Sequence, residues 1–443
     1  METAERPALS RLLSAAQTYL LWPRSALVLV AGGVLITVGG KLLGLVRELL
    51  IASTYGTGEV ANTFFAVYQL PVVVSSFMVG PFMLAYVPHY AALRDAGGER
   101  ASLRRVVRLA LVIGAAITGL MVMAAAVVHI ANVGPPWTGS FMLILALSII
   151  PLLIGGLSTV VLYARGQPLA AMTVAACGPA VMLFALALLL AVPGGGRELV
   201  LPWSATLGWL VSGVVGAAIL IRIARRAPVS AVIVPQGPTL PAQLWASSAE
   251  TLGFSLNHTL TVALATGLGA GSVAINAYAF RLILFALSSS LSPLHQAIHS
   301  WMAQSPGHRE GRTVLAVIVA MAALTVALAA TLAAFSEPVV AIVYERGAFA
   351  AASTARVAGI LAPYALYFAV MGVNQLFARY FFVSGDGWLY ARAMLAAYLV
   401  SNVAKAAVAA NYGLAGMIIV AAAFEAIALA YFVSVVVRRE LWR

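Results

Sequence analysis

The sequence predicts an all-α integral membrane protein of about twelve transmembrane helices in two six-helix lobes. Hydrophobic residues make up 62% of the 443 residues and charged residues only 9%, far from the composition of a soluble globular domain. Apolar runs of roughly 20 residues recur along the chain, and each is long enough to cross a hydrocarbon core of about 30 Å as a helix. The charged residues gather mostly between these runs.

Turn signals and charge clusters divide the chain into individual spans. The first lobe is predicted to contain spans at 26–53, 60–91, 104–132, 138–164, 168–192 and 199–224. The second is predicted to contain spans at 241–267, 272–303, 312–336, 352–384, 387–411 and 414–437. A stretch with three prolines, 227–239, predicts a cytoplasmic linker between lobes covering 26–226 and 240–437. Residues 1–25 predict a cytoplasmic or interfacial segment, and 438–443 a cytoplasmic tail.

Arginines cluster in alternate connections between the predicted spans. The four clusters comprise Arg94, Arg100, Arg104, Arg105 and Arg108; Arg222, Arg225 and Arg226; Arg309 and Arg312; and Arg438, Arg439 and Arg443. This is the positive-inside pattern of a membrane protein and not the footprint of a nucleic-acid-binding surface. We therefore expect a multi-pass protein of the cytoplasmic membrane with both termini in the cytoplasm and no nucleic-acid partner.

An internal repeat supports two lobes of the same orientation. Tyr55–Ala61 and Leu268–Ala274 both read x-Gly-x-Gly-x-Val-Ala, and their offset is about half the chain. Chance similarity of small residues in tight turns is the alternative explanation. Paired six-helix halves fit a transporter whose pathway runs between two lobes.

Ionisable residues within predicted spans are costly and usually face a cavity or a partner. They are Lys41, Arg47 and Glu48 in the first span, Glu250 in the seventh, Arg281 in the eighth, Lys405 in the eleventh and Glu425 in the twelfth. No carboxylate lies three or four residues from Lys41, Arg47 or Arg281, so pairing along their own helix is not expected.

Two interpretations of these cations stay open. Each cation makes a buried ion pair, with Glu250 or Glu48 as partner, or the three line a common cavity. A cavity rich in guanidinium and ammonium groups suits an anion, and phosphate in particular. Lys405 and Glu425 are expected to pair with each other across adjacent helices, although a coupling role for them, for Glu48 and for Glu250 is the alternative.

Signatures of enzymes are nearly absent. The chain has only two aspartates, Asp95 and Asp386, and no Gly-x-x-x-x-Gly-Lys phosphate-binding loop. His295 and His299 have the spacing of a zinc pair but lack the glutamate of a zincin helix. We expect a transporter without catalytic residues, metal or cofactor.

Three segments carry a resemblance to a known family. They are GKLLGLVRELLIASTYGTGEVANTFFAVYQLP from Gly40 to Pro71, GAGSVAINAYAFRL from Gly269 to Leu282, and YERGAF from Tyr344 to Phe349 followed by FARYFFVSGD. In this order they resemble the MurJ (MviN) family of lipid II flippases, within the exporter superfamily (MOP) that also contains the MATE multidrug transporters.

The resemblance implies a MATE-like fold and a substrate-binding site. Lys41, Arg47 and Arg281 stand where the family has cavity arginines implicated in holding the diphosphate of a lipid-linked sugar. Asn62 stands where the family has an aspartate, and 74–76 where it has an arginine pair. The sequence also stops after the twelfth span, whereas many members have two more helices. The expected substrate is therefore lipid II or a related polyprenyl-diphosphate glycan such as an exopolysaccharide precursor, with membrane lipid and glycan-assembly enzymes as partners.

Three other functions compete with a flippase. A cation-coupled multidrug exporter of the same superfamily predicts an acidic cavity without the cations. A non-transporting scaffold or regulator of glycan assembly predicts that surface exposure of the glycan survives loss of the protein. An embedded glycosyltransferase is disfavoured because carboxylates are few.

Overall fold

The protein is described here by a computed structural model that places residues 24–77, 82, 83, 86, 90, 98–192, 196–227, 240–290, 311–384 and 386–441. Within these residues all regular secondary structure is helical. Eight of the described helices are long and apolar enough to cross a membrane. The predicted all-α membrane class is confirmed. Residues 1–23, the linker residues 228–239, and His295 and His299 lie outside the described part of the chain.

The helices of the first half follow the predicted spans closely except at 60–91, of which the structure describes a helix only over Glu59–Phe77. They are α2 (Arg24–Tyr55), α3 (Glu59–Phe77), α5 (Glu99–Ile130), α6 (Thr138–Ala146), α7 (Ile149–Ala164), α8 (Pro168–Ala191) and α9 (Val200–Arg226), with a short 3₁₀ turn, η2 (Arg197–Leu199), before α9. The predicted span 138–164 is divided between α6 and α7. Pro168 begins α8, where a missing backbone N–H costs nothing.

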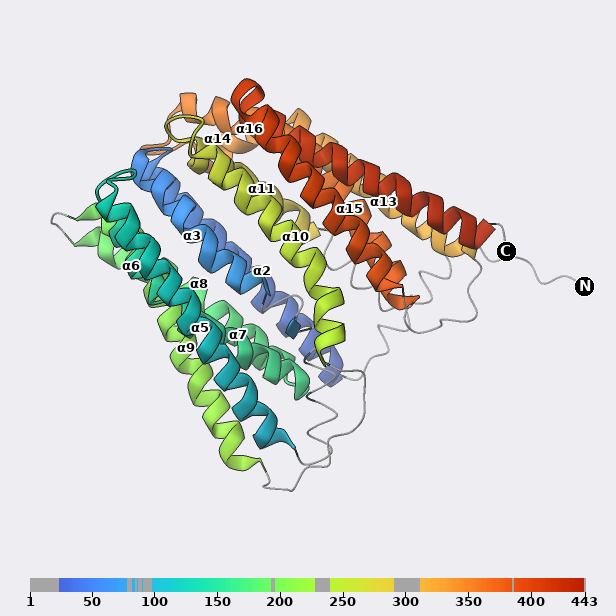
Figure 1. Cartoon of the computed structure of the whole chain (residues 1–443), viewed down its shortest axis with the longest axis horizontal. Helices are drawn as coiled ribbons and strands as arrows, with labels where there is room; N and C mark the ends of the chain where they lie inside the picture. The colour runs from blue at the N-terminus through green and yellow to red at the C-terminus, as the bar shows by residue number, and fades with distance from the viewer. Residues whose placement is uncertain are drawn as a thin grey trace, which may run out of the picture.

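The second half contains α10 (Leu240–Ala265), α11 (Ser272–Ser290), α13 (Gly311–Ala334), α14 (Ser336–Tyr344), α15 (Ala351–Val383) and α16 (Gly387–Leu441). The long α16 is two spans in sequence, because Gly413 between them has φ 58° and ψ −153°, a conformation open essentially only to glycine. The two limbs of α16 run in opposite directions (Figure 1), as the predicted boundary between 387–411 and 414–437 requires.

The helices form two groups that touch at one end and diverge toward the other (Figure 1). Contacts between the groups run from α3 to α10 and α11, and from α2 to α11 and α14. We call the touching end the closed end; it is formed by residues 53–58, 269–274 and 345–350. The opposite end is the splayed end.

Aromatic side chains fill the interface just inside the closed end. Phe65 of α3 meets Tyr278 of α11 edge-on, with ring centroids 5.3 Å apart. Tyr278 also contacts Tyr344 at 5.1 Å and Phe349 at 5.5 Å. All four are buried. Edge-to-face and tilted aromatic pairs at such distances add to the gain from burial, so this cluster stabilises the contact between the two helix groups.

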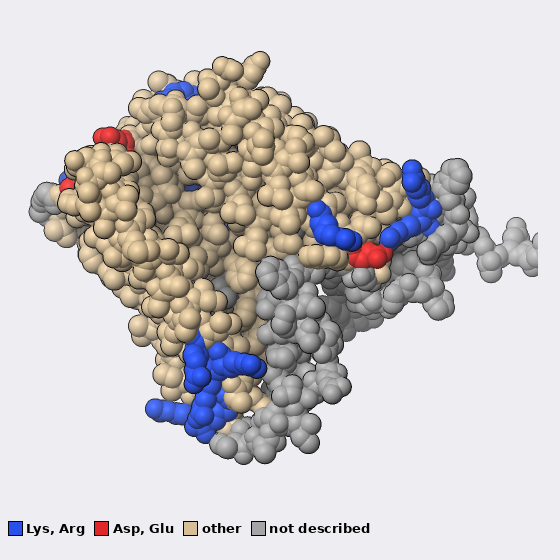
Figure 2. Space-filling view, in the orientation of Figure 1, with Lys and Arg blue, Asp and Glu red and all other residues tan. Residues whose placement is uncertain are grey.

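Basic residues lie at the splayed end (Figure 2). Arg225 and Arg226 are in the last turn of α9, and Arg438 and Arg439 in the last turns of α16. The first turns of α5 carry four further arginines. Described members of three of the four arginine clusters, those on α5, α9 and α16, are therefore found at one end of the described molecule.

Candidate functional site

A cavity of about 340 Å³ lies between the two helix groups. Helices α2 and α3 line it from one group, and α10, α11 and α14 line it from the other. Its charged residues are Lys41, Arg47, Arg281 and Glu48. Three cations against one carboxylate give the cavity a net positive charge, which favours an anionic ligand.

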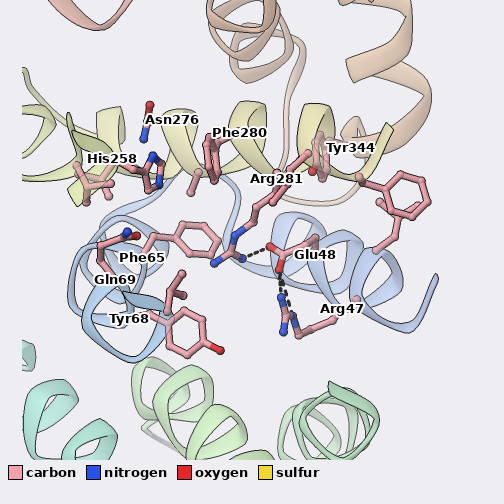
Figure 3. Close-up of a pocket in the computed structure, with 18 of the residues that line it drawn as sticks. Arg47, Glu48, Phe65, Tyr68, Gln69, His258, Asn276, Phe280, Arg281 and Tyr344 are labelled. Atoms are coloured by element: carbon pink, nitrogen blue, oxygen red, sulfur yellow. Dashed lines mark hydrogen bonds and ion pairs between the residues drawn. The ribbon is translucent and has the colours of Figure 1, made fainter. Parts of the chain in front are cut away.

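Glu48 lies between two arginines that come from different helix groups (Figure 3). Arg47 Nε donates to Glu48 Oε1 at 3.1 Å, and a second guanidinium nitrogen of Arg47 pairs with the same oxygen. Arg281 reaches across from α11 and pairs with Glu48 Oε2. Arg47 is thus neutralised by the next residue along its own helix, which differs from the expectation that its partner lies elsewhere. The reason is that both side chains turn into the same cavity.

The two arginines make further contacts with an aromatic ring and a sulfur atom, and these contacts leave some of their N–H donors free. The Arg281 guanidinium lies 4.4 Å from the centre of the Phe65 ring, an arrangement with cation–π attraction. Arg47 contacts the sulfur of Met182 on α8 at 3.2 Å. The side chains of Arg47 and Arg281 remain 14% and 21% exposed. Because a guanidinium has five N–H donors, each can bind a further oxygen ligand.

Lys41 lines the same cavity two turns before Glu48 on α2. It makes no hydrogen bond or ion pair with any residue in the described ranges. About 1.5 Å of rise per residue places it roughly 10 Å from Glu48 along the helix. An ammonium group without a described partner is therefore available at the splayed side of the arginine pair.

Uncharged polar groups in the cavity wall were not singled out from the sequence. Asn276 accepts a hydrogen bond from Tyr364 at 2.7 Å, but its buried amide nitrogen has no partner among the described residues. His258 stacks on Phe280 with ring centroids 3.9 Å apart. Gln69 donates to Thr259 across the two groups at 3.4 Å. Asn276 lies within the GAGSVAINAYAFRL segment, five residues before Arg281. This position is the sequence feature that could have identified it as a cavity residue.

Asn62, expected in the substrate-binding site, does not line this cavity. Its side-chain oxygen accepts hydrogen bonds from the backbone N–H groups of Val273 at 2.8 Å and Ala274 at 3.2 Å. These groups are in the first turn of α11, where backbone donors have no helical partner. Asn62 on α3 therefore caps a helix of the other group, and its role here is to hold the closed end.

The two repeated Gly-x-Gly turns face each other at the closed end. A Cβ on Gly271 would lie 2.5 Å from the Thr57 carbonyl oxygen, and one on Gly56 would lie 2.5 Å from the Ala348 carbonyl oxygen. Gly347 would likewise clash with the Ser53 carbonyl. The sequence indicated the repeat, but not that glycine is required at these three positions because backbones of the two groups touch.

Hydrogen bonds reinforce this contact. Ala348 N–H donates to the Ser53 carbonyl at 2.8 Å, and the Thr57 and Ser353 hydroxyls are 3.1 Å apart. The Tyr278 hydroxyl donates to the Gly56 carbonyl at 2.9 Å. The closed end is therefore sealed by main-chain contacts and not by side-chain packing alone.

The remaining predicted residues lie elsewhere. Lys405 is 1% exposed and donates hydrogen bonds to Asn257 and Thr261 of α10. Glu425 is 1% exposed and accepts a hydrogen bond from Tyr398. The hydrogen bonds of Lys405 thus go to α10 oxygens, where the sequence suggested a pair with Glu425. The Glu250 side chain lies outside the described part of the structure.

Comparison with solved structures identifies the fold. The chain superposes on a structure described as the lipid II flippase MurJ in an inward closed conformation, with a TM-score of 0.77 and 16% identity over 91% of this chain and 86% of that one. It also superposes on an inward-facing multidrug resistance MATE family transporter of the MOP superfamily, with a TM-score of 0.70 and 15% identity over 90% and 94% of the two chains. The chain therefore has the fold shared by these two structures.

Sequence comparison gives the family. Residues 51–442 match the lipid II flippase MurJ family, and the chain belongs to that family. It is 26% identical over 354 residues to a probable lipid II flippase MurJ of Rhizobium tropici. The match covers 74% of this chain and 66% of that protein, just under two thirds of its length.

Proposed function

We propose that this protein is a flippase that moves a polyprenyl-diphosphate-linked glycan across the cytoplasmic membrane by alternating access. One observation carries the proposal: arginines from both helix groups converge on one carboxylate in a shared cavity. Arginine offers paired donors that match phosphate oxygens. The substrate is lipid II or another glycan carried on the same diphosphate linkage.

The diphosphate would compete with Glu48 for the two guanidinium groups. Arg281 and Glu48 join the two helix groups in the described state, so an anion that takes over Arg281 weakens a bond between the groups. Binding of substrate is thereby linked to their separation. Lys41 and the free amide nitrogen of Asn276 supply further donors. A cavity of about 340 Å³ accommodates a diphosphate but not a long glycan, which extends toward the splayed end.

The orientation in the membrane is part of this proposal. The arginine-rich splayed end faces the cytoplasm by the positive-inside rule, with both termini on that side and the lobes formed by 26–226 and 240–437. The closed end then faces outward. With an inside-negative potential, outward movement of each negative charge is favoured by about 2.3 kcal/mol per 100 mV.

The drug-exporter alternative is less well supported. It requires acidic residues in a cavity without cations, but Glu48 shares its cavity with three of them. Glu425 is buried in the second helix group, among polar side chains.

A reconstituted flipping assay tests the function. Purified protein in vesicles is given fluorescent lipid II or another fluorescent polyprenyl-diphosphate glycan on the inner leaflet, and exposure on the outer leaflet is timed. Arg47→Ala and Arg281→Ala are expected to slow the exposure of the true substrate strongly. Arg392→Ala is the matched control, because this arginine is exposed on α16 and outside the cavity. Equal rates for all four proteins would remove the arginines from the mechanism.

A further inference from the structure

Lys405 is a fully buried ammonium group outside the cavity. It is on the first half of α16, is 1% exposed, and lies where α16 packs against α10. Its Nζ donates to the Asn257 carbonyl at 2.9 Å, to Asn257 Oδ1 at 2.6 Å and to Thr261 Oγ1 at 2.9 Å. An ammonium group has three N–H donors, so these three oxygens satisfy it completely.

A buried carboxylate, Glu425, lies on the second half of the same helix and is 1% exposed. It is itself bound by the Tyr398 hydroxyl at 2.8 Å and by Asn374. The negative charge offsets the cost of placing an ammonium in a membrane-embedded interior, which is large for an isolated charge.

The oxygen set has the composition of a cation site. A backbone carbonyl, an amide oxygen and a hydroxyl are the neutral ligands that hard metal cations take in proteins. The Thr261 hydroxyl uses its own proton on the Asn257 carbonyl at 3.0 Å, so its lone pairs face the ammonium. Packing alone does not explain the lysine, because an apolar residue of similar volume would fill the same space without requiring these oxygens. Stability alone does not explain it either, because a buried charged group with its partners is by itself weak evidence for stability.

The site lies directly behind the wall of the cavity. Asn257 is followed by His258, which lines the cavity. A much smaller space is lined by both His258 and Phe280 on one side and by Lys405 on the other. The oxygens that hold Lys405 therefore belong to the same turn of α10 that faces the proposed substrate.

We propose that Lys405 is a tethered cation that permanently fills a monovalent-cation site between α10 and α16. The second helix group therefore needs no free cation at this place, and removing the side chain opens the site to a small free cation. This goes beyond the proposed flippase function and does not depend on it, because the test reads cation binding and not transport.

The test uses full-length protein in detergent and measures melting temperature at constant ionic strength. Lys405→Ala removes three methylene groups and the ammonium, which are the atoms of n-propylammonium. In choline chloride, whose cation is too bulky for the site, the variant is expected to melt below wild type. Propylammonium or ammonium chloride is expected to raise its melting temperature by several degrees, because a ligand that binds only the folded state stabilises it.

Two variants serve as matched controls. Lys405→Met fills the space with an uncharged chain, so its melting temperature is expected to be the same in all salts. Lys41→Ala removes the chain's other lysine, which has no described partner, and is expected to show no cation-specific change. Wild type is expected to be insensitive to the choice of cation.

Three results would overturn the proposal. These are a Lys405→Ala variant that responds equally to choline and to the small cations, one that responds to none of them, and a wild type that is stabilised by one particular cation. If Lys405→Ala does not fold, the melting temperature of Thr261→Val tests the site instead, because this variant removes one oxygen ligand while keeping the side-chain size. Its melting temperature is expected to fall, and an unchanged value would refute the site.

Discussion

Replacing Gly347 by alanine should open the closed end selectively. Gly347 has φ +59°, and a Cβ there would lie closer than 3.0 Å to the Ser53 carbonyl oxygen, where 3.4–4 Å is ordinary contact. The same oxygen accepts the hydrogen bond from Ala348 N–H. The added carbon must therefore push the two backbones apart and lengthen that bond.

The size of the effect follows from these two losses. A net hydrogen bond contributes about 1 kcal/mol, and overpacking in a tight contact costs about 1–3 kcal/mol. Together they disfavour the closed end by about 3 kcal/mol, a factor of about a hundred in its population relative to an open state. The left-handed backbone strain of alanine, about 1–2 kcal/mol, is present in both states and does not shift this equilibrium.

The assay measures contact between the two helix groups directly. Thr57 and Ser353 have hydroxyls 3.1 Å apart, so cysteines at both positions can form a disulfide when the end is closed. The native Cys177 is first replaced by alanine. Gly347→Ala is expected to slow the cross-link by one to two orders of magnitude, as the estimated population change implies.

Gly166→Ala is the matched control for this prediction. Gly166 also has a left-handed φ of +71°, but a Cβ there meets nothing within 4 Å. The control carries the backbone strain without the clash, so its cross-linking should stay at the parent rate. Equal cross-linking in Gly347→Ala and Gly166→Ala would refute the view that close backbone approach holds this end.

Further predictions concern the same interface. Oxidation of the cysteine pair at Thr57 and Ser353 should stop flipping and reduction should restore it; undiminished flipping with the disulfide formed would contradict alternating access through this end. Glu48→Gln leaves two arginines without their counter-charge and should cost about 3 kcal/mol of stability, measured as a lower melting temperature. Glu59→Gln, at the first residue of α3, is the control and should change the melting temperature little. Asn62→Ala should lose about 1 kcal/mol with the helix cap, and Asn62→Asp should retain it, since a carboxylate also accepts from a helix N-terminus; a melting temperature that falls equally in both would argue against capping.

The sequence determined the class and the helices of this protein. Hydropathy and turn residues are local properties, so they placed spans such as 168–192 and 414–437 within a few residues of the helices observed. The pattern also selected Lys41, Arg47, Glu48 and Arg281, because a charge within an apolar span stands out without any knowledge of its neighbours.

Tertiary structure alone decided which groups meet. That Glu48 lies between two arginines, that Asn62 caps α11 and that the repeated glycine turns touch all depend on contacts between segments some 200 residues apart in sequence. Lys405 shows the same limit. Its position within an apolar span predicts a partner, but not that the partners are oxygens of α10. Periodicity gives the face of a helix that is buried, whereas the partner on that face is set by the packing of the other helices against it.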